Sequence, residues 1–113
     1  EARKAAAIAE AFGIPMAFHN ANGPILHAAT IQLDASIPNF AIQESFYDHW
    51  PQWKRDVIYG SLPVEGGYVK VPSRPGIGVD VNERLIEELR IRDMASLRFE
   101  AGQITWAVRG TVK

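Results

Sequence analysis

The chain has 113 residues, 47% of them hydrophobic and 22% charged, with a formal net charge of −1. These values indicate a single globular domain, and they exclude a disordered chain or a partner that needs a strongly basic surface, such as a nucleic acid or a membrane. The absence of cysteine excludes disulfides and cysteine-ligated metals, and it fits a cytoplasmic protein.

The first part of the chain predicts alternating helices and strands. Residues 2–12 are rich in alanine, which favours a helix, and Gly13 stands where a C-terminal cap belongs. Residues 14–19 are apolar throughout and predict a short buried strand. A second helix is expected to begin at Pro24, since proline suits the first helical position, after a cap at Asn22 or Gly23.

The second predicted helix leads into another strand. It is expected to pack through a stripe of Leu26, Ala29 and Leu33, and to end before Pro38. Residues 39–44 then predict a second short apolar strand. Two strands joined through one helix are typically parallel, and strands that are apolar on both faces are typically covered by helices. The predicted fold class is therefore α/β.

The pattern changes after this second strand. Residues 45–60 are rich in aromatic side chains and show no clean period. A hairpin is predicted around Gly66 and Gly67, and a loop and a short helix capped by Asn82 follow it. Residues 96–108 predict a final hairpin.

The ends of the two predicted strands carry the residues with the clearest chemical potential. His19 ends the first strand and Glu44 ends the second, so both lie at the carboxyl edge of a parallel sheet, where α/β proteins place their sites. An imidazole is the usual general base or acid near neutral pH, and a nearby carboxylate can hydrogen-bond or protonate a substrate oxygen. The pattern alone leaves two interpretations open: a catalytic pair, or a structural histidine beside a solvated carboxylate.

Neighbouring residues supply further candidates. Asn20 follows His19, and Tyr47 and His49 belong to an aromatic cluster that either walls a substrate pocket or packs its loop down. His27 falls in the middle of a helix, where a surface or packing role is expected. The histidines lack a recognised metal-ligand spacing, so no metal ligand is assigned to this chain, and nucleotide or serine-nucleophile motifs are absent from the sequence.

A family likeness lies in three segments, AEAFGIPMAFHN, GPILHAATIQLDASIPNFAIQE and GGYVKVPSRPGIGVDVNE. Together they resemble the carboxyl-terminal part of the mandelate racemase subgroup of the enolase superfamily, and most of all its sugar-acid dehydratases for galactonate, gluconate or mannonate. The resemblance implies the C-terminal fragment of a (β/α)₇β enolase-type TIM barrel plus the C-terminal part of its capping domain. Residues 1–44 correspond to the last βα units of the barrel, and residues 45–113 to the crossover and the cap.

The resemblance also implies a function. It is that of a Mg²⁺-dependent hydro-lyase, which removes the α-proton of an aldonate and eliminates water to give a 2-keto-3-deoxy acid. His19 matches the family's general base or acid, and Glu44 matches the glutamate that contacts the substrate carboxylate or the developing enolate. The Mg²⁺ ligands and the aspartate that pairs with the histidine have no counterpart here and are expected upstream of this chain.

Two alternatives remain at this point. A racemase or epimerase of the same superfamily is one, because His19 and Glu44 do not decide the outcome of proton abstraction. A non-catalytic truncated domain is the other. We expect the chain, which opens without Met, to be part of a longer cytoplasmic protein that is a homo-oligomer and binds a small sugar acid. The 113 residues alone are expected to be poorly stable and inactive, since two barrel strands leave open edges.

Overall fold

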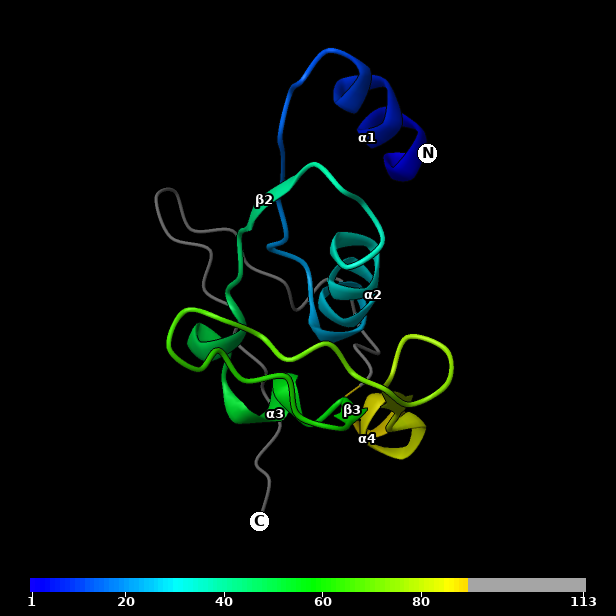
Figure 1. The fold of residues 1–113 in the computed structure, drawn as a ribbon. Coiled ribbons are helices and arrows are strands. Elements are labelled where there is room, and N and C mark those ends of the chain that lie inside the picture. The colour runs from blue at the N-terminus through cyan, green and yellow to red at the C-terminus, as the bar shows by residue number, and fades with distance from the viewer. Residues whose placement is uncertain (90–113) are drawn as a thin grey trace, which may run out of the picture.

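The computed structural model describes residues 1–89, and the hairpin predicted for residues 96–108 lies outside that part. The first half contains α1 (Ala2–Ala11), β1 (Met16–Phe18), α2 (Pro24–Asp34) and β2 (Phe40–Gln43) (Figure 1). The second half contains the 3₁₀ turn η1 (Tyr47–His49), α3 (Gln52–Arg55), β3 (Ile58–Tyr59), β4 (Asp80–Val81) and α4 (Glu83–Glu88). The predicted order of helix, strand, helix and strand is therefore confirmed.

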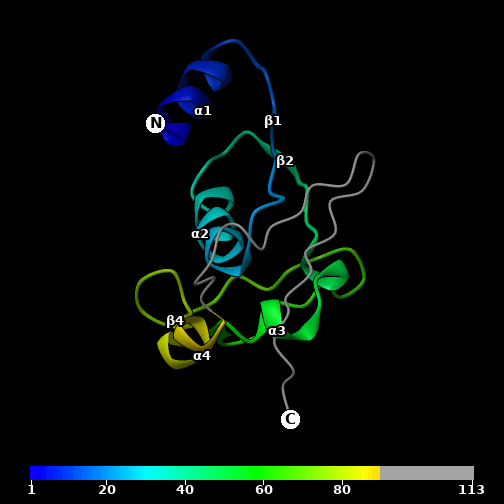
Figure 2. The ribbon, with the colours of Figure 1, turned by 180° about the vertical axis from the view of Figure 1, so that it is seen from behind.

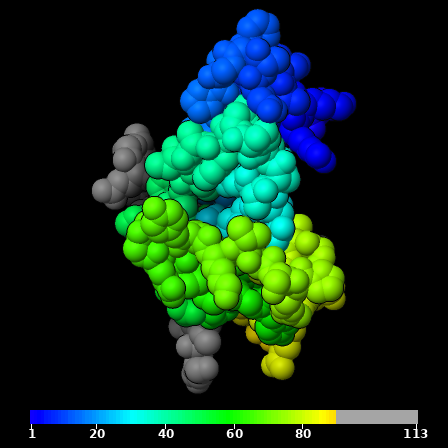
Figure 3. All heavy atoms as spheres, in the orientation of Figure 1, coloured from blue at the N-terminus to red at the C-terminus, as the bar shows by residue number. Residues whose placement is uncertain are grey.

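Figures 1 and 2 show the arrangement of these elements from opposite sides. α1 lies at one end of the molecule, the second half of the chain lies at the other, and β1 and β2 run side by side between them. The space-filling view shows the second half packed below the middle of the molecule (Figure 3). Both strands run away from α1, so their carboxyl ends point toward the second half of the chain.

The end of α1 forms as its glycine predicts. Gly13 has φ +67°, its N–H donates to the Glu10 carbonyl over 2.9 Å, and the Ile14 N–H donates to the Ala9 carbonyl over 2.9 Å. This pair of bonds is the Schellman motif, which needs a residue in the left-handed region after the helix. The Asn39 side chain then donates to the carbonyls of Ala6 and Ile14, each over 3.0 Å. These bonds tie α1 to the residue that precedes β2.

The sheet of the first half has two parallel strands, as predicted. Met16 pairs with Phe40, Ala17 with Ile42 and Phe18 with Gln43, and the register shifts by one residue after the first pair. The expectation that both strands are buried is wrong for this chain, because every residue of β1 and β2 is exposed or half-buried. The physical reason is that the described elements leave much of the strand surface uncovered. An apolar strand sequence shows only that the strand can be buried, and it does not show which elements bury it.

The buried side of α2 differs from the predicted stripe. The helix begins at Pro24 with Gly23 as its N-cap, which confirms the predicted start. Leu26 is exposed, however, and Ala29 and Leu33 are only half-buried, so the predicted apolar stripe is wrong. The side that packs inward consists of Pro24, His27, Ala28, Thr30, Ile31 and Asp34. Several of these side chains are polar, and hydrophobic periodicity cannot place such residues on an inward face.

The main apolar core joins α2 to the segment after β2. Its buried members are Ala28, Ile31, Tyr47, Trp50, Ile58 and Leu62, and Val57, Val69, Ile77 and Val79 pack against them. The turn of the predicted hairpin is confirmed, since Gly66 and Gly67 have φ values of +58° and +85° inside an antiparallel bridge. The pairing of β3 with β4 was not predicted, because strands of two residues carry no periodic signal.

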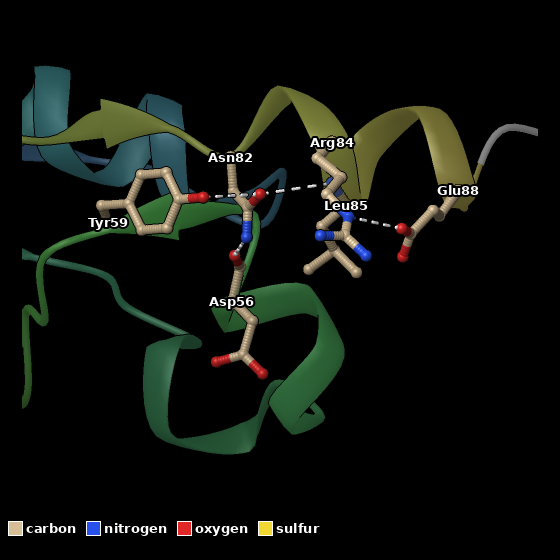
Figure 4. A network of polar contacts seen from close by, with 6 residues as sticks. All are labelled: Asp56, Tyr59, Asn82, Arg84, Leu85 and Glu88. Carbon is tan, nitrogen blue, oxygen red and sulfur yellow. Dashed lines mark hydrogen bonds and ion pairs between the residues drawn. The ribbon is translucent and has the colours of Figure 1, made fainter.

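The last described helix, α4, is capped as predicted. Asn82 Oδ1 accepts hydrogen bonds from the Leu85 N–H over 3.2 Å and from the Tyr59 hydroxyl over 3.0 Å (Figure 4). Asn82 Nδ2 donates to the Asp56 carbonyl over 3.1 Å. One side chain therefore fixes the helix start to both β3 and the end of α3. None of the helices in the described part of the chain has the length and apolarity needed to span a bilayer.

Candidate active site

The carboxyl ends of β1 and β2 bring His19 and Glu44 together. The Glu44 N–H donates to the Phe18 carbonyl over 3.1 Å, and the Gln43 side chain donates to the same carbonyl over 3.2 Å. The backbone bond extends the parallel ladder to Glu44 itself, and the side-chain bond reinforces it. His19 Nδ1 donates to Glu44 Oε2, so the two side chains are in direct contact. The predicted proximity is confirmed, and the catalytic roles of the pair stay predictions.

This contact defines the chemistry that is available to the ring. A carboxylate only accepts hydrogen bonds, so His19 Nδ1 carries the hydrogen. In the neutral ring Nε2 is then the atom with the free lone pair. The side chain of His19 is 75% exposed and that of Glu44 is 44% exposed, so a ligand can reach both. A contact this exposed adds little to stability.

An open pocket of about 440 Å³ surrounds the pair. Its lining consists of Ala17, Phe18, His19, Ile42, Gln43 and Glu44. The walls are thus mainly apolar, with the imidazole and the carboxylate as the titratable groups. Such a pocket presents a proton-accepting atom and an anion to whatever binds there, as proton transfer at a positioned side chain requires.

Asn20 follows His19 but does not lie on the surface. Its side chain is fully buried, and its Nδ2 lies 3.5 Å from Nδ1 of His27, which is also fully buried. Burial lowers the pKa of the His27 imidazole below its ordinary value of 6.5, against smaller opposing effects of the Asp48 carboxylate and the Leu62 backbone. The packing role expected for His27 is confirmed. A contact between Asn20 and a substrate stays a prediction.

The aromatic candidates after β2 lie outside the pocket. Tyr47 is buried, accepts a hydrogen bond from the Leu62 N–H over 3.1 Å, and stacks on His27 with ring centroids 5.4 Å apart. His49 is exposed, and its ring lies edge-on to Phe46. In this chain Tyr47 packs its loop down, which was one of the two interpretations that the sequence left open. Substrate contacts of Tyr47 and His49 stay predictions.

Sequence reasoning missed the contacts that His27 makes. A histidine in the middle of a helix gives no periodic signal, and its partners lie seven residues before it and twenty residues after it.

The described residues contain no group of three or more His, Asp or Glu side chains that could hold a metal ion. Mg²⁺ prefers oxygen ligands, chiefly carboxylates, and residues 1–89 offer no such set.

A protein-family model described as "Enolase C-terminal domain-like" matches residues 1–85. The chain belongs to this family. Among solved structures, the mandelate racemase/muconate lactonizing enzyme from Jannaschia sp. CCS1 superposes with a TM-score of 0.71 at 31% identity, over 80% of this chain and 22% of that one. A mandelate racemase/muconate lactonizing enzyme-like protein from Roseovarius sp. TM1035 superposes with a TM-score of 0.67 at 40% identity, over 75% of this chain and 21% of that one.

Curated relatives carry the names of sugar-acid dehydratases. A D-gluconate/D-galactonate dehydratase of Picrophilus torridus is 45% identical over all 113 residues, which span 28% of its length. A D-gluconate dehydratase of Thermoproteus tenax is 46% identical over 108 residues, which cover 96% of this chain and 21% of that protein. The resemblance that the sequence indicates is therefore confirmed. The chain has the enolase C-terminal domain fold and spans between a fifth and a third of these relatives.

Proposed function

We propose that this chain forms the C-terminal part of an acid-sugar dehydratase that converts an aldonate, such as gluconate or galactonate, to a 2-keto-3-deoxy acid. The observation that carries the proposal is the contact between His19 and Glu44 at the carboxyl ends of two parallel strands. It occurs in a chain that is 45% identical throughout to a named gluconate/galactonate dehydratase.

The architecture of the whole protein follows from the same proposal. It is a (β/α)₇β barrel with a capping domain, in which residues 1–44 supply the last βα units and residues 45–113 the crossover and the C-terminal part of the cap. The Mg²⁺ ion expected for this family takes its ligands outside residues 1–89, since those residues hold no suitable set. The aspartate partner expected for His19 also lies outside them.

In the proposed reaction one imidazole acts first as a base and then as an acid. In the proposed step His19 Nε2 accepts the α-proton, and the electron pair of the broken C–H bond forms the enolate. The bond to the β-hydroxyl then breaks, and that hydroxyl takes the proton from the same imidazolium and leaves as water. The resulting enol tautomerises to the 2-keto-3-deoxy acid, so atoms and electrons balance.

Glu44 supports both halves of this step. Its carboxylate accepts the Nδ1 hydrogen and so keeps Nε2 directed at the substrate. While the proton resides on the ring, the same carboxylate stabilises the positive charge of the imidazolium, as the acidic member of a catalytic triad does. In the whole protein, where the expected aspartate takes the Nδ1 hydrogen, Glu44 is released to contact the carboxylate end of the substrate.

The test uses the full-length protein that carries this chain, incubated with gluconate or galactonate in deuterated water. We expect 2-keto-3-deoxy acid to form, and His19→Asn to lower both its formation and α-proton exchange by about 10²–10⁴-fold. Glu65→Gln is the control, because this exposed carboxylate lies outside the pocket. Unchanged exchange in His19→Asn would remove the histidine from the mechanism.

The second candidate is a racemase or epimerase, which the names of the solved relatives favour. The same incubation separates the two activities. Exchange of the α-proton with inversion at the α-carbon, without loss of water, identifies the racemase or epimerase. The absence of both exchange and dehydration over a panel of aldonates would favour a non-catalytic domain.

A further inference from the structure

A buried cluster connects the two chain segments that leave the candidate pair. Asn20 directly follows His19, and Tyr47 follows Glu44 by three residues. Both contact the same side chain, His27 of α2. The Tyr47 ring stacks on His27 at an interplanar angle of 25°, and Trp50 meets the His27 ring edge-on with centroids 6.0 Å apart.

These contacts lie just beyond the point where the hydrogen bonds between the two strands end. Hydrogen bonds between β1 and β2 fix the chain as far as the Phe18 carbonyl and the Glu44 N–H. Beyond that point, the direction of His19 depends on where residue 20 is held, and the direction of Glu44 depends on where residues 45–47 are held. Both holding points touch His27, so one side chain connects the positions of both candidate residues.

The chemistry of the cluster suits this purpose. Asn20 and His27 are both fully buried, and a buried polar group costs free energy unless it is paired. An amide N–H of Asn20 lies toward Nδ1 of His27, which accepts it in the neutral ring that burial favours, while Asn20 Oδ1 has no hydrogen-bond partner among the described residues. A histidine supplies this acceptor together with a flat face for Tyr47, a combination that an aliphatic residue lacks.

We propose that His27 and Asn20 are positioning residues that fix the placement of His19 relative to Glu44. The inference rests on the proposed function for its catalytic consequence, but its geometric claim can be tested without activity. Neither side chain touches a substrate in this proposal, and both act through the residues to which they are joined.

The first measurement is steady-state kinetics of the full-length protein with two variants. Asn20→Leu removes the amide at similar volume, and His27→Phe removes the acceptor but keeps the ring that stacks on Tyr47. We expect kcat for dehydration to fall about 10- to 100-fold in each variant, with KM changed less than about threefold. Thr30→Val is the matched control, since it removes a buried hydrogen bond to the Leu26 carbonyl on the same helix without touching the cluster.

A third variant separates positioning from general packing. His27→Asn keeps an acceptor near the place of Nδ1 but leaves a cavity beside Tyr47, so it is less stable than His27→Phe. The proposal expects the reverse order for activity, with the Asn variant retaining more kcat than the Phe variant. If kcat follows the melting temperature across all four variants, Thr30→Val included, the residues are merely structural and the proposal is overturned.

The second measurement needs no turnover. The ring proton signal of His19 is identified by its loss in His19→Asn, and its chemical shift reports the contact with Glu44. We expect Asn20→Leu and His27→Phe to move this signal in the same direction as Glu44→Gln, and Thr30→Val to leave it in place. An unmoved signal in the first two variants overturns the inference, whereas a protein without activity but with the expected shifts overturns only the proposed function.

Discussion

Asp34 occupies an unusual place for a carboxylate. It lies at the C-terminal end of α2, is only 9% exposed, and its Oδ1 has no hydrogen-bond partner among the described residues. Burial raises the pKa of this carboxyl from 3.8 to about 6. The negative end of the helix dipole also disfavours its charge. Burial therefore favours the acid form more in the folded protein than in the unfolded chain.

The raised pKa sets the sign of a pH dependence. Between about pH 4 and pH 6 the folded state holds a proton on Asp34 that the unfolded state has lost, so the free energy of unfolding falls as pH rises through this window. We expect Asp34→Asn to remove this contribution and to raise stability at pH 7 by on the order of 1–3 kcal/mol. Urea unfolding of wild type and variant from pH 4 to pH 8 measures the difference. Parallel curves would contradict the prediction.

Buried polar residues are the individual positions that sequence reasoning could not predict. His19 and Glu44 were found because they end apolar strands, and strand ends are visible in the sequence. The burial of His27 and Asp34 was not predicted, because a pattern of hydrophobic residues assigns every polar helix position to the solvent-exposed side. Only the packing of α2 against Tyr47 and its neighbours shows their burial.

The loop before β4 closes on itself at Gly78. This residue has φ +84° and is buried, and a Cβ there would overlap the Cβ and Cγ atoms of Pro72. Pro72 cannot retreat easily, because its carbonyl accepts a hydrogen bond from Gln32 of α2 over 3.1 Å. The hydrogen bond from Gln32 thus anchors the loop to the helix that carries His27.

The loop offers a matched pair of glycines for a test. Gly76 also has a positive φ, +70°, but a Cβ there would meet no atom within 4 Å. We expect Gly76→Ala to cost about 1 kcal/mol for its backbone conformation, and Gly78→Ala to cost about 2–5 kcal/mol because overpacking is added. Thermal unfolding of the two variants side by side measures the difference in stability. Equal melting temperatures would show that Pro72 moves aside without a cost in free energy.

Elements that local chemistry determines were predicted well. The caps at Gly13 and Asn82 and the turn at Gly66 depend on a few adjacent residues, and the structure confirms them. The pairing of Ile58 with Val81 depends on two segments about twenty residues apart, and neither segment has a length that a pattern can detect. Local signals therefore position helix ends and turns, and long-range pairing escapes them.

The whole molecule leaves large apolar side chains in contact with water. Phe12 is 77% exposed, and Ile8 and Ile42 are each 66% exposed. They lie on or next to α1 and β2, at the part of the molecule that the described second half does not cover (Figure 1). The sequence predicted apolar strands but could not tell what covers them, because cover depends on neighbouring elements. In the proposed barrel, further strands and helices provide it.

Ile42 provides a test of that cover, because the expected effect differs between two forms of the protein. In the 113-residue chain alone Ile42→Lys places a charge on an exposed strand position, and we expect its stability to change by less than about 0.5 kcal/mol. In the full-length protein the proposed barrel buries the same lysine, and we expect a loss of more than about 3 kcal/mol. Ile42→Val is the control in both forms and is expected to cost about 1 kcal/mol or less. Chemical unfolding measures all four values, and a lysine that is tolerated equally in both forms would show that the strand face stays open to water and that the barrel proposal is wrong.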